Sequence, residues 1–529
     1  MKPILSLNFG YNDAENYKRR ENKEFFNKIF VRNEFLEQLL NNDKYFLIGE
    51  KGTGKTAYAV YLANNDYKDT ISELKYIRET DYAKFISLKK LKHLQLSDYT
   101  SIWKVILLLL MCNGITDKEI STNIFVKKKR LHAIRQAIDE YYAFAFSPEI
   151  INALQLVENS KIVAGLFNKY LKASGEESQT ISFNESTFQI NLMYLERQFK
   201  KTLNAIKLLK NRLLFIDGID IRPGTIPYNE YLECIKGLAN AAWELNSDYF
   251  SQIRDSKGRL RVVLLMRPDI FNSLNLQNST NKLLDNSVFL DWRTTYPTYR
   301  SSKLFKVADT ILRVQQSEQL PSGKAWDYYL PWRSRSTNPM REFDDSFIDI
   351  LRISYSRPRD IITILIFLQE IHKMMDRDSE TFSRKDLFSD IFLNKYSQYL
   401  MGSIRDQLSF YYTSEEYETF LAFFNFLNGK AQFTYHDYTE AYTKYVDFVL
   451  EKRESVPEFV ETDEKFIQFL YDTNVICYIE ETELEPLFRW CYRERSISNI
   501  SPKVKLGVTY RIHKGLLKEL NLGFMERKI

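Results

Sequence analysis

One loop of this chain has the composition of a phosphate-binding site. The segment Gly49-Glu50-Lys51-Gly52-Thr53-Gly54-Lys55-Thr56 fits the spacing GxxxxGK[ST]. Glycines let backbone N–H groups turn inward towards phosphate oxygens, and a following helix offers its N-terminus to the same negative charge. Lys55 would then reach the β- and γ-phosphates of ATP, and Thr56 would supply a hydroxyl to Mg²⁺. The alternative interpretation is a glycine turn that only caps a helix.

A second segment could hold the metal and act on water. Leu213-Leu214-Phe215-Ile216 is an apolar run that ends in Asp217-Gly218-Ile219-Asp220. A buried strand of this kind would deliver Asp217 beside the loop, where the carboxylate orders the water shell of Mg²⁺. No Glu follows Asp217, so Asp220 is the candidate that would polarise the attacking water. The alternatives are a strand capped by Asp217 and an ordinary turn aspartate at Asp220.

Two arginines could report whether a γ-phosphate is present. Arg267 follows the apolar run Val262 to Met266, and an arginine at that strand end could contact the nucleotide. Arg359, in Ser356-Arg357-Pro358-Arg359-Asp360, stands at the start of an apolar helix and could reach back from a lid. The alternatives are a solvated arginine at Arg267 and ordinary helix-start chemistry around Pro358.

The elements that must position these residues follow an α/β pattern. Short continuous apolar runs over 44–48, 213–216, 260–266 and 288–290 predict buried strands of a parallel sheet. Helices are predicted over 57–62, over 25–40 and through most of 90–210, with a hairpin or loop at 173–183. Helices also dominate 300–400, apart from a loop near 330–333. The region after 400 is predicted to be helical at first, and 501–510 resembles a β-hairpin or wing.

Composition places the chain among folded proteins of a reducing compartment. It has 529 residues, of which 44% are hydrophobic and 27% charged, which excludes disorder of the whole chain. The four cysteines form no CxxC pair and only five histidines are present, so we expect no zinc site, no disulfide framework and a cytoplasmic location. The longest apolar run, 105–112, is too short to span a membrane, and the N-terminus has no apolar signal-peptide core.

Charge is distributed unevenly near the C-terminus. Residues 401–486 carry 6 basic and 18 acidic side chains, whereas 487–529 carry 10 basic and 3 acidic ones. The two blocks could neutralise each other in the fold, or mark a surface for an acidic partner. Nucleic acid is therefore a candidate partner of 487–529. The run Lys127-Lys128-Lys129-Arg130 is interpreted as a solvated helix face, with an anionic partner as the alternative.

These motifs, in this order, resemble ASCE-type P-loop ATPases of the AAA+/STAND group. Asp217-Gly218-Ile219-Asp220 resembles the Walker B segment of NACHT-like proteins, and Met266-Arg267-Pro268 resembles their sensor-1 strand end. Arg357-Pro358-Arg359 resembles the sensor-2 region of origin-recognition-like proteins, whose lid leads into a winged helix. The opening 9–15 followed by the loop is similar to the FunZ-type bacterial P-loop ATPases, which are often associated with mobile elements and defence.

The chain also departs from that group. Ile221 stands where NACHT-like proteins often carry a further acid, which argues against rapid hydrolysis. The distance from the loop to Asp217 is long, which requires an insertion over about 90–210. The segment 272–287, where ring-forming relatives often place an arginine finger, contains no Arg. A conventional hexameric motor is therefore not expected, although a homo-oligomer stays open.

The sequence predicts an ATP- and Mg²⁺-dependent molecular switch that hydrolyses ATP slowly. The expected domains are an N-terminal helical segment (1–40), an ATPase core (41–300), a helical lid (301–400) and a winged-helix-like or helical C-terminal domain (401–529). The expected output is an effector or regulatory protein, plausibly in anti-phage defence, with no membrane partner. Two alternatives remain: an origin-recognition-like DNA-binding ATPase, and a module that binds ATP without hydrolysing it.

Overall fold

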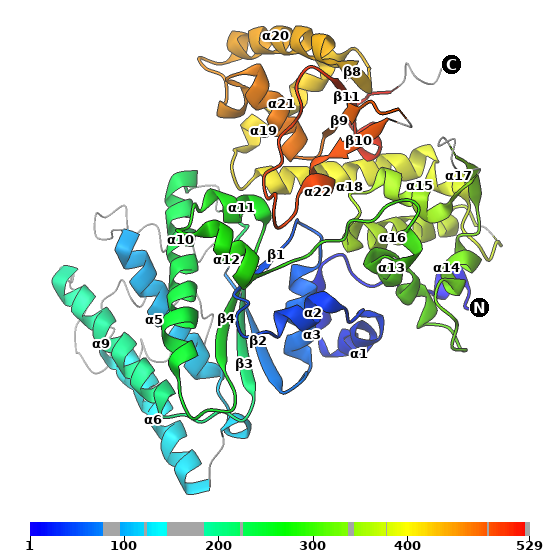
Figure 1. Ribbon diagram of the computed structural model, residues 1–529. Helices are drawn as coiled ribbons and strands as arrows, with labels where there is room; N and C mark the ends of the chain where they lie inside the picture. The colour runs from blue at the N-terminus through cyan, green and yellow to red at the C-terminus, as the bar shows by residue number, and fades with distance from the viewer. Residues whose placement is uncertain are drawn as a thin grey trace, which may run out of the picture. The chain divides into compact units, whose positions relative to one another are not determined.

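The structure is a computed structural model (Figure 1), and the contacts within the chain divide it into two compact units. It describes residues 1–77, 96–120, 124–144, 185–222, 226–336, 343–376, 378–483 and 486–523. The sheet unit comprises 34–48 and 55–288, and the helical unit comprises 1–33, 49–54 and 289–529. The predicted phosphate loop is thereby shared, since Gly49–Gly54 belongs to the helical unit while Lys55 and Thr56 belong to the sheet unit.

The sheet unit is built on a five-stranded parallel sheet with the strand order β2-β3-β4-β1-β5. The strands are β1 (Phe46–Ile48), β2 (Thr70–Tyr76), β3 (Asn211–Asp217), β4 (Leu260–Met266) and β5 (Ser287–Phe289). The helices are α2 (Glu34–Leu39), α3 (Lys55–Asn64), α5 (Leu96–Gly114), α6 (Ile124–Phe144), α9 (Glu185–Asn204), α10 (Tyr228–Glu244), α11 (Pro268–Ser273) and α12 (Ser279–Asn286).

Burial explains why the apolar runs form the central strands. Every residue of β1 and of β4 is buried, as continuous apolar runs in a sheet covered on both faces should be. Helix α10 packs on α5, and α5 packs on α9, so the described helices of the long predicted insertion gather together (Figure 1). The α/β prediction is confirmed at this level. The predicted hairpin or loop at 173–183 lies outside the described residues.

The strand order places three chemical segments at one edge of the sheet. Strand β4 lies between β1 and β3, with Ile48 opposite Met266 and Ile216 opposite Leu264. Because parallel strands run in the same direction, the carboxyl ends of β1, β4 and β3 lie at the same edge of the sheet. In the chain, β1 leads into the phosphate loop, β4 is followed by Arg267, and β3 ends at Asp217.

The helical unit contains most of the remaining helices and a smaller sheet. Its helices are α1 (Arg20–Ile29), α13 (Lys303–Arg313), α14 (Lys324–Tyr329), α15 (Ser346–Ile353), α16 (Pro358–Met374), α17 (Arg384–Leu387), α18 (Asp390–Leu408), α19 (Ser414–Ala422), α20 (Tyr435–Lys452), α21 (Asp463–Asp472) and α22 (Cys491–Glu494). Its strands are β6 (Arg333–Arg335), β7 (Phe343–Asp345), β8 (Gln432–Thr434), β9 (Ile476–Glu480), β10 (Leu487–Trp490) and β11 (Thr509–Ile512).

The small sheet corrects the sequence-based expectation for the C-terminal region. Strands β8 to β11 form an antiparallel sheet with the order β10-β9-β11-β8. The predicted hairpin at 501–510 is wrong, because only Thr509 and Tyr510 of that segment lie in a strand. The hairpin instead joins β9 to β10. These strands are three to five residues long, too short to show a clear alternating pattern.

None of the described helices combines the length and the apolar character needed to cross a bilayer.

Candidate functional site

The residues Gly49–Gly54 form a tight loop held by two left-handed glycines. Gly52 has φ +87° and Gly54 has φ +96°, a backbone region that side chains with a Cβ rarely occupy. Thr53 closes a turn on Glu50, because both its backbone N–H (3.2 Å) and its hydroxyl (2.7 Å) donate to the Glu50 carbonyl. Gly52 and Gly54 are therefore required by the backbone conformation.

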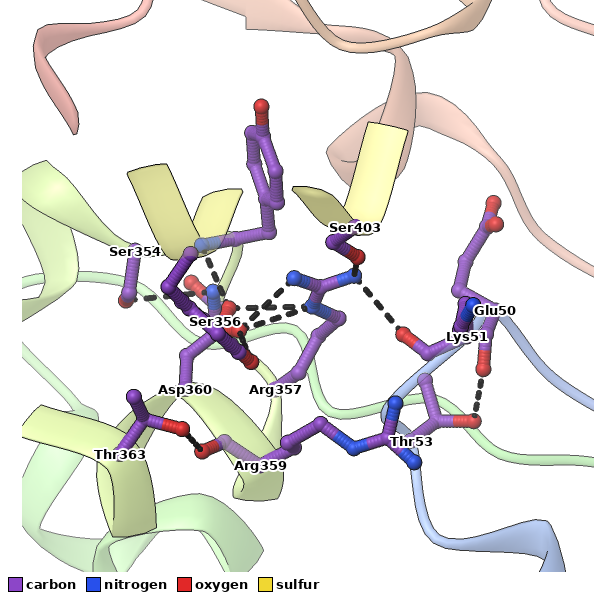
Figure 2. A network of polar contacts seen from close by, with 12 residues as sticks. Glu50, Lys51, Thr53, Ser354, Ser356, Arg357, Arg359, Asp360, Thr363 and Ser403 are labelled. Atoms are coloured by element: carbon purple, nitrogen blue, oxygen red, sulfur yellow. Dashed lines mark hydrogen bonds and ion pairs between the residues drawn. The ribbon is translucent and has the colours of Figure 1, made fainter. Parts of the chain in front are cut away.

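Residues from the start of α16 bind this loop from within the helical unit (Figure 2). Arg357 Nη1 donates to the Lys51 carbonyl at 2.8 Å, and the Arg359 backbone N–H donates to the Gly52 carbonyl at 3.3 Å. A Cβ added to Gly52 would lie 3.3 Å from the Cβ of Arg359, tighter than most such contacts. The loop and the start of α16 thus pack as closely as a glycine allows.

Arg357 is fixed by a buried ion pair. Its guanidinium donates to both carboxylate oxygens of Asp360, at 2.7 Å from Nη2 to Oδ1 and 3.0 Å from Nε to Oδ2, and Asp360 is fully buried. Burial alone would lower the pKa of Arg357, but the Asp360 carboxylate raises it above its ordinary value. Asp360 Oδ2 also accepts from the backbone N–H of Tyr355. Arg357 is therefore a rigid, permanently charged support for the loop carbonyl.

Arg359, the predicted lid sensor, lies beside the loop but is engaged with the N-terminal segment. Its Nε donates to the Asn12 carbonyl at 3.0 Å, and the Asn12 side chain accepts from Thr363 Oγ1 at 2.9 Å. Arg359 is half-buried. The structure brings this predicted residue to Gly52, and the N-terminal segment orients its guanidinium.

Three side-chain and backbone contacts from distant parts of the helical unit also hold the loop. Lys51 Nζ forms an ion pair with Asp406 of α18 at 2.7 Å, and Glu50 forms one with Arg495. Trp292 Nε1 donates to the Thr53 carbonyl at 2.8 Å. No local pattern in the sequence marks these three partners, which lie hundreds of residues from the loop.

In the sheet unit, Thr56 and Asp217 meet. Thr56 Oγ1 donates to Asp217 Oδ2 at 2.7 Å, and the Gly218 backbone N–H donates to Asp217 Oδ1 at 2.8 Å. Asp217 is 7% exposed. Burial and then the charge of Asp220 raise the pKa of Asp217 to about 6, against the lowering effects of Thr56, Gly218 and Lys55. Burial and Asp220 thus disfavour the charged form of the Asp217 carboxylate, and a cation bound beside it would stabilise that form.

The turn after β3 is shaped around Gly218. This residue has φ +87°, and a Cβ there would lie 2.3 Å from the Ile77 carbonyl oxygen. The Tyr231 hydroxyl lies 2.9 Å from the carbonyl oxygens of both Ile219 and Ile221, which steadies the turn. Asp220 is half-buried in this turn and close enough to act on the pKa of Asp217. Tyr231 was not anticipated from the sequence.

Arg267 is tied to its own helix. It is 1% exposed, and it donates to Asp269 from Nε to Oδ1 at 3.0 Å and from Nη2 to Oδ2 at 2.5 Å. Arg267 is also the N-cap residue of α11, which begins at Pro268. The structure therefore places it at the predicted strand end, in a bidentate ion pair.

The oxygen donors present fit Mg²⁺ better than a zinc-type metal. Among the described residues no group of three or more His, Cys, Asp or Glu side chains could hold a metal ion by itself. Mg²⁺ is commonly held by one or two protein oxygens, with phosphates and water completing the shell. The Thr56 hydroxyl and the Asp217 carboxylate form such a pair. All four cysteines are buried and free.

Comparison with known proteins does not assign the chain to a family. The chain matches no protein-family model, and a search of the curated proteins finds no match.

Proposed function

We propose that the chain is a P-loop ATPase of the AAA+/STAND kind, which binds Mg²⁺-ATP and hydrolyses it slowly. The observation that carries this proposal is the 2.7 Å contact between Thr56 and Asp217. A GxxxxGKT spacing could arise by chance, and so could an apolar run that ends in Asp. The two segments are separated by 161 residues, and yet the fold brings the hydroxyl and the carboxylate together as a shared Mg²⁺ site requires.

The proposed roles follow from these positions. The backbone N–H groups of Gly49–Gly54 cradle phosphate, Lys55 contacts the β- and γ-phosphates, and Thr56 with Asp217 holds the metal. Bound Mg²⁺ would neutralise charge on the phosphate oxygens. Asp220 accepts the proton of, or orients, the attacking water.

Slow turnover is proposed from the same residues. No glutamate stands beside Asp217, and Arg267 is already paired with Asp269. An arginine supplied by a partner can raise the rate of phosphoryl transfer by about 10³–10⁵. We therefore propose that turnover depends on a partner, and a wild type that never releases phosphate would favour the structural-ligand alternative.

The contacts of the loop with the helical unit support the role of a switch. Arg357 and Arg359 bind the loop backbone, and Asp406 and Arg495 bind its side chains. Any change of loop conformation on nucleotide binding must alter contacts with α16, α18 and the C-terminal segment. The proposed output is an effector or regulatory protein in anti-phage defence, with the chain acting in the cytoplasm.

The test of ATP binding is Lys55→Ala. We expect calorimetry with Mg²⁺-ATP to show binding by the wild type and at least a tenfold to hundredfold loss in the variant, since charge-assisted bonds to phosphate are lost. Lys75→Ala is the matched control, because Lys75 lies in β2 of the same unit and pairs with Glu73. Equal affinities of wild type and Lys55→Ala would overturn the proposal.

A DNA-binding ATPase is the second candidate function. It is favoured by the element order α19-β8-α20-α21-β9-β10-β11, which agrees with the winged-helix interpretation. The charge of α21 opposes it, because this helix carries Asp463, Glu464 and Asp472 against one lysine. Recognition helices that enter DNA grooves approach phosphates, where negative side chains are unfavourable.

The basic segment after 487 provides the test of this candidate. Lys503 and Lys505 are exposed, Arg511 is half-buried, and Lys505 lies 3.6 Å from Glu480. We expect weak, salt-dependent DNA binding in a fluorescence anisotropy titration. Charge reversal at these three residues should reduce the salt slope by about one unit for each lost phosphate contact. No binding at low salt would leave the protein partner as the output.

A further inference from the structure

Helices α6 and α9 of the sheet unit pack on each other (Figure 1) and carry an excess of positive charge. Helix α6 has five lysines and arginines against two acidic residues, and α9 has three against two. Neither function proposed above uses these helices. Within the described part of the chain, the cations of the two helices that form no ion pair are Lys127, Lys128, Lys129, Arg130, Arg135, Arg197 and Lys201.

Burial shows which side of α6 faces outward. Ile134 and Ala137 are buried, whereas Lys128, Lys129 and Arg135 are exposed. Lys128 and Arg135 are seven residues apart, which is about two turns, so they lie on the same face of the helix. Lys129 lies beside Lys128. The outward face of α6 is therefore a basic face.

Helix α9 repeats this arrangement. Leu195 and Phe199 are buried, whereas Met193, Arg197 and Lys201 are exposed. The exposed residues follow one another at intervals of four, which places them in one row along the helix. Two unpaired cations and one apolar side chain thus form the outward row of α9.

The lysines of the two helices lie at the same end of the helix pair. Ile120, four residues before α6, forms an isolated β-bridge with Leu208, four residues after α9. The three lysines of α6 stand in its first two turns, and Lys201 stands in the last turn of α9. The bridge therefore brings these cations into one neighbourhood.

Such an arrangement of charge is unfavourable for the helices themselves. The first turn of α6 has no acidic residue and ends in Lys127, although the positive end of the helix dipole disfavours cations there. Arg197 and Lys201 are like charges four residues apart, which also lowers helix stability. Among the described side chains of α6, Asp139 is the only acidic one. A merely solvated face leaves these costs in place, whereas a polyanion would offset them.

An exposed ring narrows the chemistry of the polyanion. Phe125 is 85% exposed, and it stands three and four residues before Lys128 and Lys129, which places it on their face of α6. An acidic protein offers carboxylates but no stack of free planar groups, and a duplex keeps its bases stacked inside. A single strand offers phosphates to the cations and an unpaired base to the ring.

We propose that the outward faces of α6 and α9 bind single-stranded nucleic acid. The phosphates contact Lys128, Lys129 and Arg135, with Arg197 and Lys201 extending the contact, and a base stacks on the Phe125 ring. Binding is independent of base sequence, because phosphates are common to all nucleotides and every base has a face that can stack. This proposal does not rest on the proposed ATP binding.

The experiment is a fluorescence anisotropy titration of a labelled oligothymidylate with the full chain. The strand has about 20 nucleotides, enough for such a surface, and the salt concentration varies between about 50 and 200 mM. The helix-face variant combines Lys128→Gln, Lys129→Gln and Arg135→Gln. Its affinity should fall by at least about tenfold. Its log–log salt slope should fall by about 2, since each phosphate contact with a single strand contributes about 0.7.

The matched control removes three lysines of the helical unit. Lys306, Lys373 and Lys385 are exposed and unpaired within the described residues, and their combined change to Gln lowers the net charge by the same amount. This variant should bind as the wild type does. Equal losses in the two triple variants, or no loss in the helix-face variant, would overturn the proposal. Thermal unfolding checks that both variants keep the fold.

The Phe125 ring tests the choice of a single strand. Phe125→Ala should weaken oligothymidylate binding by about fivefold or more, with the salt slope unchanged, because stacking involves no phosphate. Phe343→Ala is the control, since Phe343 is 51% exposed in the helical unit and should not contribute. A duplex of the same length that binds as tightly as the strand would overturn the proposal, and so would equal competition by polyglutamate.

Two other variants separate this proposal from the functions proposed above. Lys55→Ala should leave oligothymidylate binding unchanged, so binding of the strand without binding of ATP would sustain this proposal while the ATPase proposal fails. Charge reversal at Lys503, Lys505 and Arg511 should leave most of the binding. If that reversal abolishes binding and the helix-face variant retains it, the strand belongs to the C-terminal segment and the proposal fails.

Discussion

The two halves of the phosphate-loop motif are supported in different ways. In the sheet unit, Lys55 and Thr56 are the first residues of α3, and the Thr56 hydroxyl donates to Asp217 at the end of the buried strand β3. In the helical unit, Gly49–Gly54 is bound through its carbonyls and through two side chains whose partners come from distant segments. One half is organised by a regular sheet and the other by individual long-range contacts.

This difference suggests that the two halves of the motif have different roles. The sheet half contains every group that we propose to hold metal or activate water. The helical half contains groups that sense or restrain the loop. Substitutions in the first should change chemistry with little effect on stability, and substitutions in the second should change stability and coupling more than chemistry. Three predictions test that contrast.

The largest effect is expected at Asp220 in the sheet unit. Asp220→Asn keeps the shape of the side chain and removes the proton acceptor, so single-turnover phosphate release should slow by about 10²–10⁴-fold while ATP binding is kept. Asp217→Asn provides the comparison, since loss of the metal-holding carboxylate should weaken Mg²⁺-dependent ATP binding itself. Unchanged hydrolysis in Asp220→Asn would remove this residue from the catalytic set.

The sheet half of the site was the more predictable one for a physical reason. Strand β4 has the predicted bounds, and β1, β3 and β5 differ from the predicted ones by only a few residues, because continuous apolar runs of this length are buried on both faces of a parallel sheet. The loop and Asp217 are local patterns attached to such strands. Strand β2 was missed, because it lies at the sheet edge and its sequence TISELKY is neither a continuous apolar run nor a regular alternation.

The contacts that hold the loop in the helical unit could not be predicted from the sequence in the same way. Arg495 and Asp406 are ordinary surface-type residues in the sequence, and only the tertiary fold brings them to Glu50 and Lys51. The motif Arg357-Pro358-Arg359 led to Arg359 as the candidate lid residue, and it did not indicate that Arg357 is the buried arginine that binds the loop carbonyl. The roles of the predicted site residues and the predicted domain boundaries stay predictions.

A smaller effect, on stability, is expected at the Glu50–Arg495 pair. The Arg495 side chain is 5% exposed and that of Glu50 is 15% exposed. Arg495→Met leaves the carboxylate buried without its partner and should lower the free energy of unfolding by about 3 kcal/mol. The double variant with Glu50→Gln should recover most of that loss, as urea denaturation would show.

The Lys51–Asp406 pair is the matched control for that measurement. Its side chains are 24% and 63% exposed, so solvent screens the interaction. Lys51→Met should therefore change the free energy of unfolding by less than about 1 kcal/mol. An equal loss in Lys51→Met and Arg495→Met would show that burial does not distinguish the two contacts, and the contrast within the loop would fail.

The pH dependence of the helical unit gives the last prediction, at His513. This residue is 1% exposed, its Nδ1 accepts from the Gly515 backbone N–H, and its Nε2 lies 3.3 Å from the Ser354 carbonyl, which fixes the neutral Nε2–H tautomer. Burial, followed by the nearby charges of Arg493, Arg357 and Lys514, lowers the pKa of His513 to about 3, against the raising effect of the Ser354 carbonyl.

The sign of the effect follows from this lowered pKa. The unfolded chain binds the proton near pH 6.5 and the folded chain only near pH 3, so the contribution is complete above about pH 6.5 and is lost as the pH falls towards 3. Between pH 6.5 and 4.5 the free energy of unfolding should fall by about 2–3 kcal/mol, at roughly 1.4 kcal/mol per pH unit. His513→Gln keeps an N–H donor for the Ser354 carbonyl but has no titrating ring. The variant should therefore have a lower free energy of unfolding than the wild type at pH 7, and that free energy should fall less on acidification. The measurement is thermal unfolding followed by tryptophan fluorescence, to which Trp490, with its ring 4.9 Å from the His513 ring, contributes together with five other tryptophans. The exposed His436→Gln is the control and should follow the wild type. If His513→Gln and the wild type lose stability equally between pH 7 and 4.5, acid sensitivity of the helical unit comes from other groups.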